Sequence, residues 1–137
     1  LFTAFRAGAE SYEGISKGDW LARVGRFVAS IHQRNVTHTD LSSGNVLFTL
    51  IDGESTFYAI DIGRARFDDR HNPFADLARV CYKLDWPDRE TLMASYLGHY
   101  RLNKKHRWRW WCRAYDYKLA LKKGLKGNLK RARGKRT

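Results

Sequence analysis

A short stretch near the middle of the chain carries the residue types that phosphoryl transfer needs. Residues 38–45 are His-Thr-Asp-Leu-Ser-Ser-Gly-Asn, and an Asp-Ile-Gly begins at Asp61. Transfer of a γ-phosphoryl group requires metal ions that bridge the phosphates and a carboxylate that orients the attacking hydroxyl. Asp40 suits the role of general base, and the side-chain oxygens of Asn45 and Asp61 suit Mg²⁺, which prefers oxygen ligands.

Each part of this pattern also has an explanation without chemistry. A histidine beside a loop, an Asx turn and an ordinary Asp-x-Gly turn would produce the same residues. The chemical interpretation is favoured because the two parts occur in this order, with Asn45 at its expected offset after Asp40. We therefore take Asp40 as the candidate base, and Asn45 and Asp61 as candidate nucleotide and metal ligands. His38 is expected to support the structure of the catalytic loop.

Two short strands should bring the metal ligands together. Residues 46–50 and 57–60 have the aliphatic and aromatic composition of strands. Residues 52–53 between them are Asp-Gly, a tight-turn signal. Because an antiparallel pair places its outer ends side by side, Asn45 and Asp61 should converge.

Helices are predicted on both sides of this hairpin. Residues 16–34 start with Ser-x-x-Asp, which has capping spacing, and then carry apolar residues at steps of three and four. Residues 75–80 predict a second helix, and residues 88–100 a third, preceded by Trp-Pro. The apolar run at residues 1–5 predicts the end of a strand.

Length and composition describe a folded chain of one domain or less. The chain has 137 residues, of which 43% are hydrophobic and 14% aromatic. Cys81 and Cys112 lack the spacing of a disulfide framework or a zinc site, which favours a reducing compartment. No apolar run approaches the roughly 18 residues of a membrane span, and no signal peptide opens the sequence.

The positive charge belongs to the C-terminal segment. The net charge is +12, with −2 in residues 1–98 and +14 in residues 99–137. In residues 104–113 basic residues alternate with tryptophans, which fits a membrane-surface helix, a nucleic-acid-binding face or the buried side of a last helix. Residues 122–137 predict a basic, mobile tail. Near an anionic leaflet each of its cations would contribute about 1 kcal/mol to membrane binding.

Residues 38–45 and 61–63 resemble the catalytic loop and the Asp-Phe-Gly element of the protein-kinase-like superfamily. The resemblance implies an α+β, mainly α fold with a small hairpin after the catalytic loop, and ATP as co-substrate with Mg²⁺ or Mn²⁺. No Gly-rich phosphate loop or strand lysine is present. We therefore expect residues 1–121 to form a kinase-like C-terminal lobe that starts near the inter-lobe hinge and is inactive without an N-terminal lobe.

Within this superfamily the chain is similar to the lipopolysaccharide core kinases. The helix predicted at residues 75–80 leaves no room for a long activation segment after Gly63. Residues 60–67, Ile-Asp-Ile-Gly-Arg-Ala-Arg-Phe, resemble the bacterial Kdo and heptose kinase family, in which an arginine-containing run follows the metal-binding aspartate. The resemblance covers roughly residues 16–100. It implies ATP-dependent phosphorylation of a sugar hydroxyl of lipopolysaccharide core, at the cytoplasmic face of the inner membrane.

Three more residues are candidates for this site. Arg64 and Arg66 either hold a phosphate or acidic groups of the acceptor, as arginine does bidentately, or face solvent, which fits Arg66 better than Arg64. Asp76 either supports the catalytic-loop backbone from a neighbouring helix, as a buried aspartate does in kinase-like folds, or is an exposed acid favoured by the helix dipole. The sequence leaves these alternatives open.

Two other functions fit the same residues. The small atypical Ser/Thr kinase or ATPase of the tRNA-modification machinery also lacks an activation segment and ends in a basic tail like residues 133–136, Arg-Gly-Lys-Arg. A non-catalytic kinase-lobe relic would bind anionic lipid or nucleic acid through its basic C-terminus. We expect the lipopolysaccharide kinase, with ATP, the core sugar and an anionic membrane surface as partners, and nucleic acid as a less favoured one.

Overall fold

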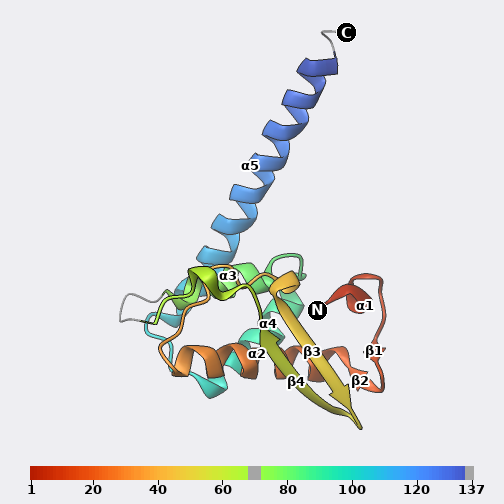
Figure 1. The fold of residues 1–137 in the computed structure, drawn as a ribbon, viewed down its shortest axis with the longest axis vertical. Coiled ribbons are helices and arrows are strands. Elements are labelled where there is room, and N and C mark those ends of the chain that lie inside the picture. The colour runs from red at the N-terminus through yellow and green to blue at the C-terminus, as the bar shows by residue number, and fades with distance from the viewer. Residues whose placement is uncertain (68–71, 135–137) are drawn as a thin grey trace.

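The computed structural model of the chain describes residues 1–67 and 72–134. It confirms an α+β fold that is mainly α, with two small antiparallel hairpins (Figure 1). The elements are α1 (Thr3–Arg6), β1 (Ser11–Tyr12), β2 (Ile15–Ser16), α2 (Lys17–Gln33), β3 (Val46–Ile51), β4 (Glu54–Ala59), α3 (Pro73–Cys81), α4 (Trp86–His99) and α5 (Trp108–Gly134).

Helix α2 is the centre of the core. Its start is capped as predicted, since the Ser16 side chain accepts a hydrogen bond from the backbone N–H of Asp19 at 3.2 Å. Its buried stripe packs along α4, which lies beside it in Figure 1. The two helices approach so closely at Gly25 that a Cβ there would overlap the backbone oxygen of Leu92. This crossing therefore requires glycine.

The β3–β4 hairpin confirms the predicted strand-turn-strand unit. Asp52 and Gly53 both have positive φ, 51° and 79°, the conformation of a type I′ turn, which matches the twist of the flanking strands. The strands pair from Ile51 with Glu54 at the turn to Val46 with Ala59 at the open end. Side chains alternate between a face that packs on α2 and an outer face that is exposed.

Aromatic rings and one arginine fix the hairpin to α2. The fully buried Trp20 ring lies 4.9 Å from that of Phe48 and 5.3 Å from that of Phe57, centroid to centroid. Near the turn, Arg23 donates from Nη1 to the Gly53 carbonyl at 2.8 Å and to the Ser55 hydroxyl at 3.1 Å. These contacts fix the orientation of the hairpin, and with it the position of Asp61 after β4.

Helix α5 is attached to the rest of the fold through its first turns. Trp108 and Cys112 are buried there, which fits the third of the three alternatives for this stretch, whereas Trp110 is exposed. The buried Arg89 of α4 donates two hydrogen bonds to the Asp116 carboxylate, at 2.8 and 3.1 Å, and one to the Leu84 carbonyl at 2.8 Å. Burial disfavours the charge of Arg89, but the bonds to Asp116 outweigh this effect and raise the pKa of the guanidinium.

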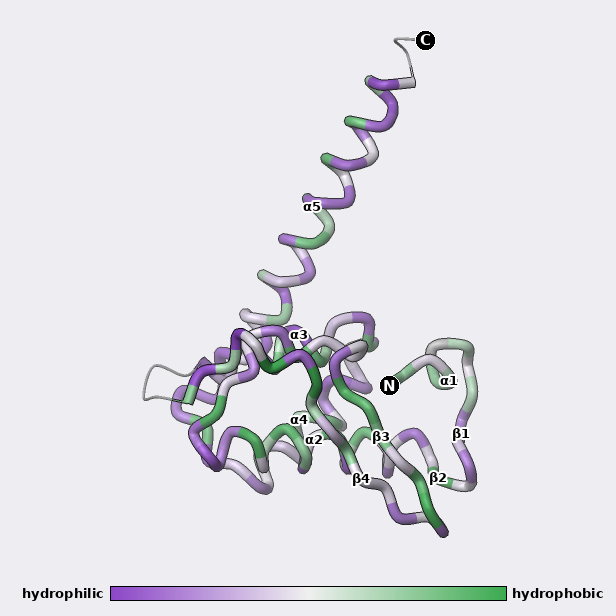
Figure 2. Tube along the Cα trace, viewed as in Figure 1, coloured by the Kyte–Doolittle hydropathy of each residue, from purple (hydrophilic) through white to green (hydrophobic). Residues whose placement is uncertain are grey.

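Beyond these contacts α5 extends away from the body of the molecule (Figure 1). The expected boundary at 121/122 falls inside this helix, and residues 122–134 of the tail that we predicted to be mobile are helical. Lysine, leucine, arginine and alanine are strong helix formers, and they outweigh the glycines in this segment. The outer half of α5 is mostly hydrophilic with isolated hydrophobic positions (Figure 2). Among the described residues, no helix combines the length and apolarity that crossing a membrane requires.

The prediction of a strand at residues 1–5 is wrong. Residues Thr3–Arg6 form one helical turn, and Phe2 before it is buried in the core. An apolar run this short has no periodicity that distinguishes a strand from a buried helical turn.

Candidate active site

The predicted catalytic loop connects α2 to β3, and its position is fixed by burial. The side chain of Leu41 is fully buried, while that of Asp40 is half-buried. After Leu41 the chain forms a 3₁₀ turn at Ser43–Asn45 that leads directly into β3. The buried Leu41 thus fixes the loop to the core, while the carboxylate of the neighbouring Asp40 stays partly exposed.

His38 joins the catalytic loop to the segment that ends in Asp61. Its Nε2 donates a hydrogen bond to the carbonyl oxygen of Ile60 at 2.7 Å, and its Nδ1 accepts one from the backbone N–H of Asp40 at 3.1 Å. The side chain is buried. One imidazole therefore fixes the residue before Asp61 and the backbone of Asp40 together, which is the supporting role expected of His38.

Asn45 and Asp61 lie at the same end of the hairpin. The carbonyl of Asn45 accepts a hydrogen bond from the backbone N–H of Ile60 at 2.9 Å. The Asn45 amide group donates from Nδ2 to the Asp40 carbonyl at 2.8 Å and to Asp40 Oδ2 at 3.2 Å. Asp61 is exposed and has left-handed backbone angles, φ 60° and ψ 54°, and residues held in this region cluster at functional sites.

The donor set at this end of the hairpin fits a magnesium ion. Because Asn45 uses its amide nitrogen toward Asp40, its amide oxygen is left as an available ligand at the end of the hairpin that leads into Asp61. Mg²⁺ commonly takes one or two protein oxygens and completes its shell with phosphates and water. No group of three or more His, Cys, Asp or Glu that could hold a metal occurs in the described part of the chain. A magnesium site formed by one Asn and one Asp does not require such a group.

The segment after Asp61 runs antiparallel to the start of the catalytic loop. Thr37 and Arg66 exchange backbone hydrogen bonds of 2.9 and 2.8 Å, and the Thr39 hydroxyl donates to the Arg64 carbonyl at 3.0 Å. Thr39 has φ 70°, a strained conformation for a β-branched residue. These hydrogen bonds join the segment before Asp40 to the segment after Asp61.

Asp76 of α3 accepts hydrogen bonds from the backbone of the strained catalytic loop. Its side chain is fully buried, so it is not the exposed helix acid of the alternative interpretation. Oδ2 accepts from the backbone N–H of His38 at 2.9 Å, and Oδ1 accepts from that of Thr39 at 2.9 Å. Oδ2 also accepts from Nε2 of His32 at 3.0 Å. Hydrogen bonds of this kind, to a buried carboxylate, are among the stronger ones in proteins.

A buried chain of side chains continues from Asp76 into the helical core. Nδ1 of His32 lies 2.7 Å from the hydroxyl of Tyr96. Burial raises the pKa of Tyr96, so its hydroxyl remains protonated and pairs with Nδ1. Nε2–H of His32 then donates to Asp76. This chain connects α4, α2 and α3 to the catalytic loop.

The structure therefore brings the predicted site residues into one region around the hairpin end. Arg64 and Arg66 follow Asp61, are exposed, and line an open pocket beside the loop. Sequence reasoning missed His32 and Tyr96, because a residue spacing of 64 carries no local signal. It also missed Arg79, which lines the same pocket from α3.

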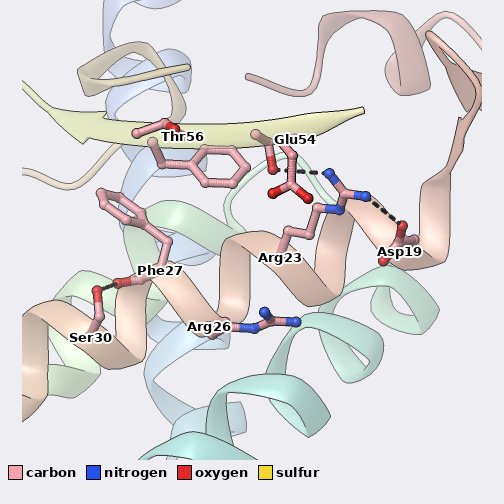
Figure 3. Close-up of a pocket in the computed structure, with 9 residues that line it drawn as sticks. Asp19, Arg23, Arg26, Phe27, Ser30, Glu54 and Thr56 are labelled. Carbon is pink, nitrogen blue, oxygen red and sulfur yellow. Dashed lines mark hydrogen bonds and ion pairs between the residues drawn. The ribbon is translucent and has the colours of Figure 1, made fainter. Parts of the chain in front are cut away.

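A second open pocket, of about 520 Å³, lies between α2 and β4 (Figure 3). Arg23 crosses it to reach Asp19 and the hairpin turn, and Arg26 and Phe27 project from the same helix. Its strand residues, 54–57, are next to the turn. It is therefore at the opposite end of the hairpin from Asp61 and outside the candidate active site.

The model of the family described as "Lipopolysaccharide kinase (Kdo/WaaP) family" matches residues 2–96. These residues include the catalytic loop, the hairpin, α2, α3 and most of α4. No curated protein and no solved structure matches the chain significantly.

Proposed function

The chain belongs to the lipopolysaccharide kinase (Kdo/WaaP) family, and from this premise we propose that it transfers the γ-phosphoryl group of ATP to a sugar hydroxyl of lipopolysaccharide core. The family indicates a kinase acting on lipopolysaccharide. The observation that supports the finer statement is the convergence of Asp40, Asn45 and Asp61 at one end of the hairpin. One base and two oxygen ligands for the metal are the groups that the catalytic-loop half of a kinase-like site contributes to phosphoryl transfer.

In this proposal each residue has a distinct role. Asp40 orients the acceptor hydroxyl and accepts its proton; Oδ2 is held by Asn45 Nδ2 at 3.2 Å, which leaves Oδ1 to face the acceptor. The amide oxygen of Asn45 and the carboxylate of Asp61 would hold Mg²⁺, which when bound neutralises charge on the phosphates. His38 and Asp76 position the loop through the hydrogen bonds described above.

The outer face of the hairpin supports a nucleotide site next to these ligands. Leu47 and Tyr58 are direct cross-strand neighbours, each 50% exposed, and Ile60 continues the apolar face up to Asp61. Ligand pockets are lined mainly by apolar side chains with a few fixed polar groups. We propose that the base of ATP lies against this face while its phosphates reach the ligands at the open end.

For the location we propose the cytoplasmic face of the inner membrane, with α5 as the membrane contact. Leu121, Leu125 and Leu129 recur at four-residue steps and are all exposed, with exposed fractions of 50, 63 and 61%. Lysines and arginines flank them along the helix. A helix with an apolar stripe and basic flanks binds in the interface of an anionic bilayer through both apolar burial and charge.

Label transfer from [γ-³²P]ATP tests the activity. With the full-length protein and lipopolysaccharide core oligosaccharide, label should appear on the sugar and should depend on divalent metal. Label found only on protein side chains would contradict the sugar acceptor and favour the atypical Ser/Thr kinase.

Vesicle binding tests the role of α5. Deleting residues 122–137, or replacing the three leucines Leu121, Leu125 and Leu129 by serine with all charges kept, should weaken binding to anionic vesicles. The deletion should also lower activity on the glycolipid while sparing a soluble, truncated acceptor. The vesicle binding of the wild-type protein should fall as salt screens its charges. Unchanged vesicle binding in both variants, or RNA binding that outcompetes lipid at physiological salt, would contradict the membrane role.

A further inference from the structure

An open pocket of about 350 Å³ lies beside the catalytic loop, on the side of the segment that follows Asp61. It is formed where the antiparallel segments described above meet the first turns of α3. Its lining is Thr37, Thr39, Arg64, Arg66, Asn72, Ala75 and Arg79.

The lining of this pocket is cationic. Among the described residues, it contains three arginines and no acidic residue. The side chains of Arg64 and Arg66 are exposed and have no hydrogen bond or ion pair with the described residues. The nearby carboxylate of Asp76 is buried and already accepts three hydrogen bonds. Within the described chain, no carboxylate therefore forms an ion pair with the arginines of this pocket.

Arg79 differs from the other two because its position is fixed. Its Nη1 donates to the Ala75 carbonyl at 3.2 Å, and its guanidinium lies 5.3 Å from the centre of the Tyr115 ring. Only one of its five N–H donors is engaged by the contacts in the described chain. A fixed guanidinium with free donors is suited to bidentate binding of a phosphate or carboxylate.

A buried polar atom gives a second, independent indication of a ligand. The hydroxyl of Thr37 is buried and has no hydrogen-bond partner in the described chain, although Thr37 lines this pocket. A buried hydroxyl without a partner is destabilising. A water molecule between it and a ligand in the pocket would supply that partner.

The pocket is also adjacent to the reacting group. Thr39 precedes Asp40 directly, and consecutive Cα atoms are about 3.8 Å apart. We propose that Arg64, Arg66 and Arg79 form an oxyanion subsite for a phosphate or carboxylate group that the acceptor sugar already carries. This inference rests on the proposed kinase function, and it implies that a reaction installing the acidic group on the acceptor precedes this one.

Binding of small sugars tests the subsite without requiring turnover. Glucose 6-phosphate, glucuronate and glucose are titrated into the full-length protein by calorimetry at constant ionic strength. The two acids should bind saturably and glucose should not. Arg64→Gln, which alters an exposed side chain, and Arg79→Gln should each weaken binding of the acids by about tenfold or more. Arg26→Gln, an equal charge change in the pocket between α2 and β4, should leave binding unchanged.

Each contrary result has a definite meaning. Equal losses in the Arg26, Arg64 and Arg79 variants would show a general charge effect and overturn the subsite. Saturable binding of inorganic phosphate without binding of glucose 6-phosphate, or full competition of the acids by ATP with Mg²⁺, would also overturn it. Binding that depends on Arg64 supports the subsite even where no phosphoryl transfer is detected. Transfer without such binding overturns the subsite and leaves the kinase function intact.

Discussion

Removal of the Asp76 carboxylate should release the catalytic loop from the helical body. Its oxygens accept hydrogen bonds from the backbone N–H groups of His38 and Thr39, both at 2.9 Å, and from Nε2 of His32 at 3.0 Å. The side chain is fully buried. Bulk water therefore does not replace a lost partner, and Asp76→Ala leaves three donors without an acceptor.

The expected loss of stability is about 3–5 kcal/mol. Each unsatisfied buried donor costs about 1–3 kcal/mol, while relaxation of Thr39 from its φ of 70° returns about 1–3 kcal/mol. Three such donors together cost about 3–9 kcal/mol, so the net loss centres on about 4 kcal/mol, within the roughly 3–5 kcal/mol lost when one partner of a buried pair is removed. It is a large share of the about 5–15 kcal/mol by which a domain is stable. Asp76→Asn keeps the volume and part of the acceptor capacity, and should lose about 1–3 kcal/mol.

Urea denaturation of the wild-type and variant proteins measures these losses, and hydrogen exchange locates them. The backbone amides of His38 and Thr39 should be protected in the wild type and exchange faster in both Asp76 variants. Asp52→Asn is the control, because Asn-Gly also forms a type I′ turn, and its effect should stay within about 0.5 kcal/mol. An Asp76→Ala protein within about 1 kcal/mol of the wild type, with unchanged protection of these two amides, would refute the network.

Three further predictions follow from individual contacts. Gly25→Ala should destabilise the fold, because its Cβ would overlap the backbone of α4. Gly18→Ala, in the same helix and with open space around it, should stabilise the fold by about 0.5–1 kcal/mol. Thermal unfolding midpoints in the opposite order would contradict this packing. Asp116→Ala should cost about 1–3 kcal/mol in urea denaturation because it removes two hydrogen bonds from the buried Arg89, while Asp116 itself is about a third exposed, and a loss below about 0.5 kcal/mol would show that the pair does not anchor α5. Asp61→Asn should abolish turnover with little change in unfolding midpoint, since the side chain is exposed; near-native activity would show that Asp61 is not a metal ligand.

The β3–β4 hairpin and helix α2 were predictable because the sequence patterns that specify them are local. An Asp-Gly pair between two apolar runs specifies a tight turn, and the observed φ angles of Asp52 and Gly53 are those that this turn needs. The cap at Ser16 and the apolar stripe of α2 are likewise encoded within a few residues. The hairpin also predicted that Asn45 and Asp61 lie at the same end. The hydrogen bond between Asn45 and Ile60, the residue before Asp61, agrees with this prediction.

The support of the catalytic loop could not be predicted from local patterns. Asp76 reaches His38 and Thr39 across 38 and 37 residues, and His32 reaches Tyr96 across 64. Such contacts depend on how α2, α3 and α4 pack together, which residue spacing does not encode. The sequence could offer only the two alternatives for Asp76, and burial distinguishes them.

The ends of the chain show a different limit. The run at residues 1–5 was too short for its periodicity to identify a helical turn. In residues 122–134 the high charge favoured a mobile tail, whereas the helix propensity of the same lysines and arginines favours the helix that is observed. Helix propensity therefore accounts for the local structure of these residues, and the mobility of the segment stays a prediction.

The kinetic effect of Asp40→Asn tests the central claim most directly. In the full-length protein, with ATP, Mg²⁺ and a core oligosaccharide, this variant should lower kcat by about 10²–10⁴-fold. The KM for ATP should change little, because the proposed mechanism places Asp40 at the acceptor hydroxyl and assigns the nucleotide to Asn45 and Asp61. An unchanged kcat, or an effect confined to the KM for ATP, would contradict the assignment of Asp40 as the base and with it the proposed mechanism.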